Sequence, residues 1–261
     1  MSLRIATYNI HKGVSGLGRK LRVRELRHAL AAIDADIVFL QEVQDRNERL
    51  AAARPDYPEG RQLDFLAGEG YEHSAYGMNA VYPHGHHGNA ILSRLPIQHH
   101  LNHDISDHVL EKRGLLHAVV RSASQEVHLI NVHLGLFKGS RKRQAQFIID
   151  FVRRELPASA PLVIAGDFND WQKRVDQMLR EELGLLEAAA AQSRLGLVDR
   201  LLLSRPRAPR VAKTFPAFLP WLSLDRIYLR GFEVADAHVP KGLAWAKRSD
   251  HAPLIADVRF H

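Results

Sequence analysis

Short apolar runs with strand character recur along the whole chain, separated by polar turns. They are rich in β-branched and aromatic residues, and they cover residues 4–8, 36–40, 89–93, 117–121, 126–132, 161–166, 225–229 and 254–260. Three further segments repeat apolar residues at helical spacing, at residues 23–33, 140–156 and 174–183. This alternation predicts an α/β protein in which strands outnumber helices.

No feature of the 261-residue sequence divides it into parts. There is no change in composition, no Gly/Ser-rich linker, no internal repeat and no low-complexity segment. Chains of this length often form one domain in α/β and double-sheet folds. We therefore expect a single domain over residues 1–261.

Polar functional groups follow several of the predicted strands. The clearest case is VIAGDFNDW, residues 163–171, where an apolar run ends in a glycine and is followed by Asp167, Asn169 and Asp170. Two residues apart on an extended backbone, Asp167 and Asn169 would point to the same side. Other strands end or begin at Asn9, Glu42, His133, Asp225, Asp250 and His251. Loops at strand ends commonly carry functional groups, so the pattern predicts one site assembled from the whole chain.

Composition narrows the chemistry of such a site. The chain has no cysteine, so any metal would be held by Asp, Glu, Asn or His. A net charge of +7, with basic clusters at residues 19–27, 138–144 and 204–213, favours a phosphate-bearing partner, although each cluster could equally be a solvated face. The N-terminal segment lacks a long apolar stretch, and no run of about 18–20 apolar residues occurs. We therefore expect no signal peptide, no transmembrane segment and a cytoplasmic protein.

The chain resembles the endonuclease/exonuclease/phosphatase superfamily, which has the DNase I-like fold. The motifs NIHKG, HHGNA, EKRG, VHLGL, AGDFNDW and SDHAPL occur in that order, as in a poorly characterised bacterial subgroup of metal-dependent hydrolases. The resemblance implies a four-layer α/β/β/α sandwich of two mainly antiparallel sheets. It also implies hydrolysis of phosphoesters with a divalent metal, Mg²⁺, for which Mn²⁺ could substitute.

The resemblance also implies roles for the strand-end residues. Glu42 would be the principal metal ligand, Asp250 the second carboxylate at the metal, and Asn9 the amide that positions Glu42 or the metal-bound waters. Mg²⁺ prefers oxygen ligands and keeps several waters, so one or two carboxylates suffice to hold it.

The remaining strand-end residues would carry the chemistry on the phosphate. Asp167 would orient or deprotonate the attacking water, and Asn169 would bind the phosphate. Asp225 would pair with His251, which would contact the phosphate. His133 would be the general acid on the leaving group, unless it is a satisfied core histidine. Asp170 is expected to be structural.

Three neighbouring features have open interpretations. Arg113 either binds substrate phosphate, as its guanidinium geometry allows, or forms a surface ion pair with Glu111. Asn89 is expected to belong to the scaffold. The cluster of His84, His86 and His87 lies in a glycine-flanked segment that we expect to be a flexible loop, where adventitious metal binding is favoured over a dedicated site.

The substrate is left open by the sequence. Our first hypothesis is a Mg²⁺-dependent phosphodiesterase, with DNA or RNA slightly favoured by the charge and by Arg113. A phospholipid-headgroup phosphodiesterase is favoured by the apolar segment at residues 214–224, which either forms an exposed lip or packs over the core. A phosphomonoesterase is a further alternative. A different class of hypothesis is that the protein is not an enzyme but a non-catalytic module that binds nucleic acid or lipid. The oligomeric state is not encoded.

Overall fold

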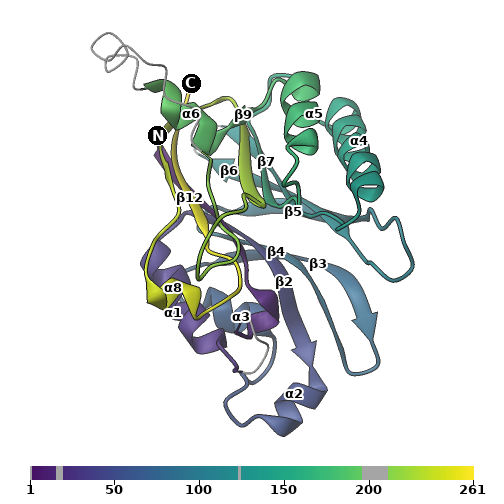
Figure 1. Ribbon diagram of the computed structural model, residues 1–261, viewed down its shortest axis with the longest axis vertical. Coiled ribbons are helices and arrows are strands. Elements are labelled where there is room, and N and C mark those ends of the chain that lie inside the picture. Colours follow the sequence, from purple (N-terminus) through teal and green to yellow (C-terminus); the bar gives the residue numbers. More distant parts are fainter. Residues whose placement is uncertain (1, 16–19, 123–124, 196–210) are drawn as a thin grey trace.

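The strands pair into two six-stranded sheets (Figure 1). This computed structural model describes residues 2–15, 20–122, 125–195 and 211–261, so Arg19 and residues 204–210 of two basic clusters lie outside the described residues. In strand order, the first sheet comprises β11 (Phe232–His238), β12 (Leu254–Phe260), β1 (Ser2–Asn9), β2 (Ile37–Asn47), β4 (Gly85–Ser93) and β3 (His73–Tyr82). The second comprises β5 (Ile97–Asp104), β6 (Gly114–Ser122), β7 (Gln125–His133), β8 (Leu162–Asp167), β10 (Asp225–Arg230) and β9 (Leu186–Glu187).

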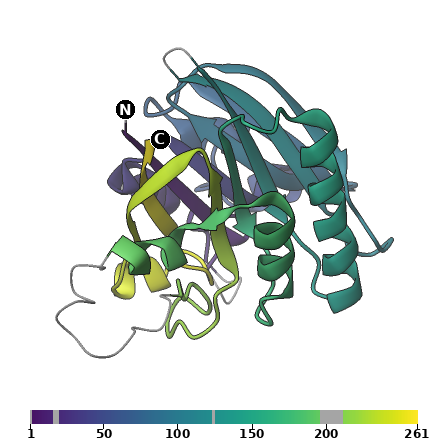
Figure 2. The same ribbon diagram turned by 90° about the horizontal axis from the view of Figure 1, so that it is seen from above.

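Both sheets are mainly antiparallel, as predicted. Among the strands that the structure describes, only two neighbouring pairs run parallel, β1 with β2 and β7 with β8. The first and last strands, β1 and β12, are antiparallel neighbours, so the two ends of the chain lie close together in both views (Figures 1 and 2).

Helices cover the outer face of each sheet. Helices α1 (Val23–Ile33) and α3 (Gln62–Ala67) lie on the first sheet, and α4 (Lys138–Glu155) and α5 (Arg174–Leu183) lie side by side on the second (Figure 1). The other helices within the described residues are η1 (His11–Gly13), α2 (Glu48–Ala53), α6 (Ala188–Leu195) and α8 (Leu243–Ala246). The three long helices match the predicted segments, two of them to the residue and α4 to within two residues.

Three buried apolar clusters hold these layers together. One fills the space between the two sheets, around Ile5, Phe39 and Leu129. The other two lie between each sheet and its helices. The arrangement is the predicted four-layer sandwich, in which each sheet buries both faces. Within the described residues, no helix is both long and apolar enough to cross a lipid bilayer.

Candidate active site

Three neighbouring strand ends of the second sheet bring candidate residues together. Strand β7 ends at His133 and β8 at Asp167, and these two residues are paired in the parallel register. Strand β10 begins at Asp225, which is paired with Asp167 on the other side. The sheet therefore places all three side chains side by side, as the strand-end pattern predicted.

Gly166 makes this close approach possible. Its φ is +146°, and a Cβ added there would lie 1.9 Å from the carbonyl oxygen of Val132 on β7. The absence of a side chain at this position therefore lets β8 pack tightly against β7, next to the pairing of Asp167 with His133.

Asn9 reaches the same carboxylate from the first sheet. Its Nδ2 donates to Oδ2 of Asp167 at 3.1 Å, and its own carbonyl accepts a hydrogen bond from Ser249 Oγ at 2.7 Å. Asn9 is thus in contact with Asp167, and it also accepts a hydrogen bond from the backbone N–H of His11. The site is built across both sheets.

His251 and Asp225 form a buried hydrogen-bonded pair. His251 Nδ1 donates to Asp225 Oδ2 at 2.8 Å, and Thr214 Oγ1 donates to the same oxygen at 2.5 Å. The other ring nitrogen, Nε2, lies 3.7 Å from Asp167 Oδ2. Burial alone would lower the pKa of His251, but the carboxylates of Asp225 and Asp167 outweigh it and raise the pKa to about 10. The imidazole is therefore a buried cation.

Asp167 is poised to titrate near neutral pH. Burial raises the pKa of this carboxyl group to about 6, against the opposing effect of the charged His251. Its Oδ1 accepts the backbone N–H of Asn169 at 3.0 Å, and His133 Nε2 lies 3.5 Å from its Oδ2. A carboxylate with such a pKa is suited to general base catalysis.

His133 is fully enclosed and neutral. Burial, reinforced by the positive charges of Arg113 and His251, holds the pKa of His133 well below its ordinary value. A neutral imidazole can still donate one hydrogen bond.

Asn169 lies in a tight turn rather than on extended backbone. Its φ is +49°. The expectation that Asp167 and Asn169 point to the same side assumed an extended backbone at both residues, and that assumption was wrong. Strand β8 has already ended at Asp167, and Asn169 Nδ2 donates to the carbonyl of Leu134 at 2.9 Å. Asp170 is structural, as expected, because its two oxygens accept the backbone N–H groups of Arg174 and Asp176 at the start of α5.

Glu42 stands at an irregularity of β2. Its φ is +56°, and the pairing of β2 with β4 shifts between Leu40 and Val43. The side chain is half-buried and, in the part of the chain that the structure describes, makes no hydrogen bond or ion pair. Such an unpartnered carboxylate fits a hard cation such as Mg²⁺.

Asp250 lies beside the Asp225–His251 pair. Its carboxylate is partly exposed and lies 3.7 Å from Nδ1 of His11. Its backbone carbonyl accepts the N–H of Ala217 at 2.7 Å. Among the described residues, no hydrogen bond or ion pair joins Asp250 to Glu42. Potential ligand atoms from Asp167, Asp225 and His251 do lie within 4.8 Å of one another.

Arg113 forms an ion pair with Glu111 at 3.1 Å, and both side chains are mostly buried. The pair lies near His133, since the charge of Arg113 acts on that imidazole. Asn89 donates to the carbonyl of Gly114, as a scaffold residue would.

The histidine cluster lies mostly on a strand, with only His84 in the turn between β3 and β4. His86 and His87 belong to the start of β4, and His86 Nδ1 lies 3.0 Å from the hydroxyl of Tyr76. The glycines on either side are also part of this strand, which pairs with β2 and β3.

A buried polar network that we did not predict links the strands that carry the site residues. Asn131 on β7 donates to the carbonyls of Leu40 and Ala90 and accepts from Gln41 Nε2 at 2.8 Å. Gln41 in turn contacts Thr7 on β1. The network joins the two sheets next to the ends of β1 and β7 and at the middle of β2. Its sequence signal was a polar residue inside each of three apolar strands.

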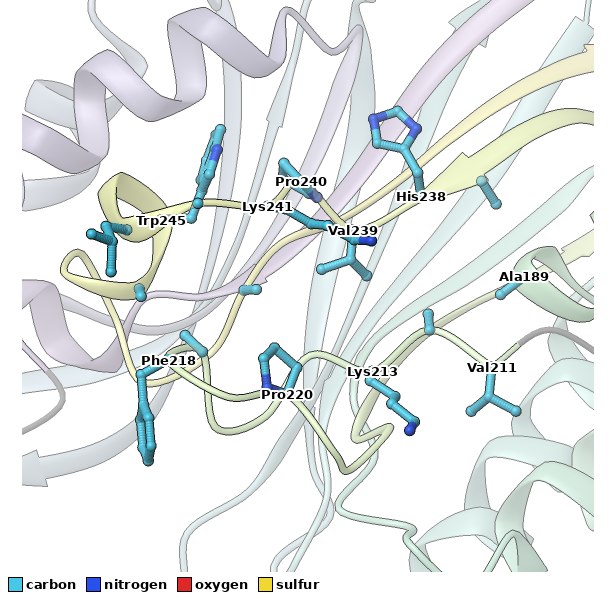
Figure 3. A pocket seen from close by; sticks show the side chains of 17 residues that line it. Ala189, Val211, Lys213, Phe218, Pro220, His238, Val239, Pro240, Lys241 and Trp245 are labelled. Atoms are coloured by element: carbon cyan, nitrogen blue, oxygen red, sulfur yellow. The ribbon is translucent and has the colours of Figure 1, made fainter.

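Two cavities adjoin the loop before β10, and one of them is lined by Asp250. The smaller, about 460 Å³, is lined by Asp250, Arg22, Phe215 and Lys247. The larger, about 760 Å³, lies between the segment that carries Lys213 and Pro220 and the segment that carries Val239 and Trp245 (Figure 3). Both share Ala217, Phe218 and Ala246.

The segment at residues 214–224 is partly an exposed lip. Thr214 and Leu224 are buried, but Phe218, Leu219 and Trp221 are 76%, 67% and 63% exposed. Packing over the core, one of the two interpretations from sequence, is therefore wrong for these three side chains.

Comparisons with known proteins agree with this geometry. The E. coli (strain K12) protein YbhP is 39% identical over 99% of this chain and 97% of its own length. A Bacteroides vulgatus endonuclease/exonuclease/phosphatase structure superposes with a TM-score of 0.75 at 18% identity, covering all of both chains. Zebrafish TDP2 in complex with a single-stranded DNA product gives 0.71 at 18% identity over 99% of both chains. The human nocturnin catalytic domain with bound sulfate gives 0.70 at 19% identity, over all of this chain and 94% of nocturnin.

The family predicted from the motifs is confirmed. The sequence model of the Endonuclease/Exonuclease/phosphatase family matches residues 6–251, an interval that begins just before Asn9 and ends at His251. The chain belongs to the endonuclease/exonuclease/phosphatase family.

Proposed function

We propose that the chain is a metal-dependent phosphodiesterase whose attacking water is activated by Asp167. The observation that carries this proposal is the surroundings of one buried carboxylate. Asn9, His133 and His251 converge on Asp167 from three separate parts of the chain. Its raised pKa suits a group that accepts a proton from water near neutral pH.

Glu42 and Asp250, with Asn9 nearby, are the residues that would hold the metal. Their oxygen donors favour Mg²⁺, with Mn²⁺ as a substitute. A bound divalent ion would stabilise the charge that develops on the phosphoryl oxygens.

The remaining residues would act on the phosphate itself. His251, kept positive by Asp225, would bind a phosphate oxygen through Nε2. Asn169 would donate from its amide to a second oxygen. His133, neutral in the free protein, would donate a hydrogen bond from its ring N–H to the leaving oxygen. To act as general acid it would first have to gain a second proton once the substrate phosphate is bound. Arg113, held by Glu111, would add positive charge at the edge of the site.

The relatives are consistent with this assignment. The TDP2 structure contains a single-stranded DNA product, and nocturnin contains sulfate, an anion of similar shape to phosphate. Because candidate site residues run from Asn9 to His251 and interlock across both sheets, we also propose that residues 1–261 act as one domain.

The test is hydrolysis by the purified protein of bis-p-nitrophenyl phosphate, p-nitrophenyl phosphate and supercoiled plasmid, with Mg²⁺, with Mn²⁺ and with a chelator. Diester cleavage that the chelator abolishes is the expected result. Cleavage of the monoester alone would make the protein a phosphomonoesterase. Absence of turnover on every phosphoester offered would favour the non-catalytic binding module.

A further inference from the structure

Exposed apolar side chains gather around the candidate active site. Nine of the thirteen large apolar side chains exposed in the described residues lie in four segments, residues 107–113, 134–138, 168–173 and 211–222, which we call the catalytic rim. The nine are Val109, Leu110, Leu136, Phe137, Trp171, Val211, Phe218, Leu219 and Trp221. Each of the first three segments contains or adjoins a candidate site residue, and Phe215 of the fourth packs against His251. The exposure is therefore concentrated where substrate would enter.

The first three rim segments are joined by direct contacts. The backbone N–H of Leu136 donates to Glu111 at 3.0 Å, and the ring of Phe137 lies 5.6 Å from that of His108. Arg141, whose guanidinium donates to the carbonyl of Leu136, stacks over Trp171 at 4.5 Å. The rim therefore continues from one segment to the next.

The fourth segment is tied to the third and to the catalytic pair. The N–H of Phe168 donates at 2.9 Å to the carbonyl of Leu224, two residues beyond the end of the fourth segment. The ring of Phe215 lies 4.9 Å from that of His251. The exposed side chains thus surround the site rather than marking separate surfaces.

The rim is also positively charged at its surface. Lys112, Lys138, Lys173 and Lys213 are exposed. The rim carboxylates next to them are covered by cationic partners, since Asp107 pairs with Arg143 and Glu111 with Arg113. Apolar side chains interleaved with lysines are the combination that binds anionic lipid surfaces.

The most exposed rim side chains favour lipid over nucleic acid. Leu110 is 99% exposed and Val109 is 85% exposed. Neither has a ring on which a base could stack or a group that could form a hydrogen bond with one, and binding of single strands depends on such stacking. The adjoining 760 Å³ cavity has walls of the same kind, with Val211, Val239, Pro240 and Leu243, and with Lys213 and Lys241 among its lining residues (Figure 3).

We propose that the catalytic rim docks on the surface of an anionic lipid bilayer. The apolar tips insert at the interface while the lysines contact anionic headgroups. If the proposed phosphodiesterase activity holds, on which this second step rests, the substrate is then a phosphodiester in a lipid headgroup.

The test measures binding without turnover. The full chain is sedimented with vesicles of phosphatidylcholine alone and of phosphatidylcholine with phosphatidylglycerol. Leu110→Ser and Phe218→Ser are compared with Leu101→Ser, a control that is 58% exposed on β5, away from the rim. We expect binding to the anionic vesicles only, reduced at least tenfold by each rim substitution and unchanged by the control. Because all three side chains are largely exposed, none of these variants should unfold.

Two outcomes would overturn the proposal. One is no binding to anionic vesicles, or binding that the rim and control variants share equally. The other is a rim-dependent affinity for a single-stranded oligonucleotide with no affinity for vesicles, which would make the rim a nucleic-acid surface. The two proposals fail separately. A protein that cleaves bis-p-nitrophenyl phosphate but does not bind vesicles would refute the docking alone. One that binds vesicles through the rim but cleaves no diester would refute the proposed function alone.

Discussion

Nδ1 of His251 lies 2.8 Å from Oδ2 of Asp225, and both side chains are buried. The carboxylate fixes which ring nitrogen carries the proton and leaves Nε2 facing Asp167. A buried imidazole would ordinarily be neutral, so its positive charge depends on these carboxylates.

Asp225→Asn should therefore impair catalysis more than substrate binding. The amide cannot support a positive imidazole, so kcat for bis-p-nitrophenyl phosphate should fall by about 10²–10⁴-fold, while KM changes less. Thr214→Val removes the other hydrogen bond to the same oxygen and should have a smaller effect. Equal kcat values for Asp225→Asn and wild type would show that the pair is only structural.

Glu42→Gln should weaken metal binding. Replacing an unpartnered carboxylate with an amide removes one charged ligand, so Mn²⁺ and Mg²⁺ affinities measured by calorimetry should each fall at least tenfold. Glu48→Gln, which alters an exposed ion pair with Arg46, is the control and should leave them unchanged. The same metal affinities in the Glu42 variant would remove that residue from the metal site.

Asp170→Ala should destabilise the fold without touching the proposed chemistry. The side chain accepts two backbone N–H groups at the start of α5, so its loss should lower the free energy of unfolding by about 1–2 kcal/mol. Denaturant unfolding measures this, with exposed Asp56→Ala as a control that should stay within about 0.5 kcal/mol of wild type. A change no larger than that of the control would contradict the capping role.

A buried histidine pair away from the site predicts acid sensitivity. His117 Nε2 lies 3.1 Å from His128 Nδ1, and burial, aided by the neighbouring histidines, lowers the pKa of His117 from 6.5 to about 4. The unfolded chain then binds a proton more readily than the folded protein, so stability is full above pH 6.5 and is lost as the pH falls toward 4. On acidification from pH 7 to pH 5, protonation of this residue should lower the free energy of unfolding by about 2 kcal/mol.

The corresponding experiment is denaturant unfolding of wild type and His117→Gln at the two pH values. On acidification, the free energy of unfolding of the variant should fall by about 2 kcal/mol less than that of wild type. Exposed His100→Gln on β5 should behave like wild type. A His117→Gln variant with the full wild-type loss would show that other groups carry the acid sensitivity.

The sequence predicted the central strands of the fold and missed the outer ones. Six of the eight apolar runs lie entirely in strands of the structure, and the other two, residues 36–40 and 161–166, begin one residue before their strands. The four strands with no predicted counterpart, β3, β5, β9 and β11, are the edges of the two sheets. An edge strand is less completely covered, so it needs fewer apolar residues, and β5 reads IQHHLNHD. β9 is only two residues long, too short to leave a pattern.

The sequence predicted which strand ends carry the candidate site residues, but not how their side chains contact one another. Register places His133, Asp167 and Asp225 together, because adjacent strands bring their ends to one edge. The contact from Asn9 depends on how the two sheets stack, which local patterns do not encode. The positive φ values of Glu42 and Asn169 depend on tertiary contacts that override the ordinary backbone preference of these residues.

The most direct test of the account is the rate at which wild type and Asp167→Asn hydrolyse bis-p-nitrophenyl phosphate with saturating Mg²⁺. Asparagine keeps the shape of the side chain but cannot accept a proton, so the account predicts a rate lower by about 10²–10⁴-fold in a variant that remains folded. A variant that hydrolyses the diester at the wild-type rate would contradict the assignment of Asp167 as the base, and with it the proposed mechanism.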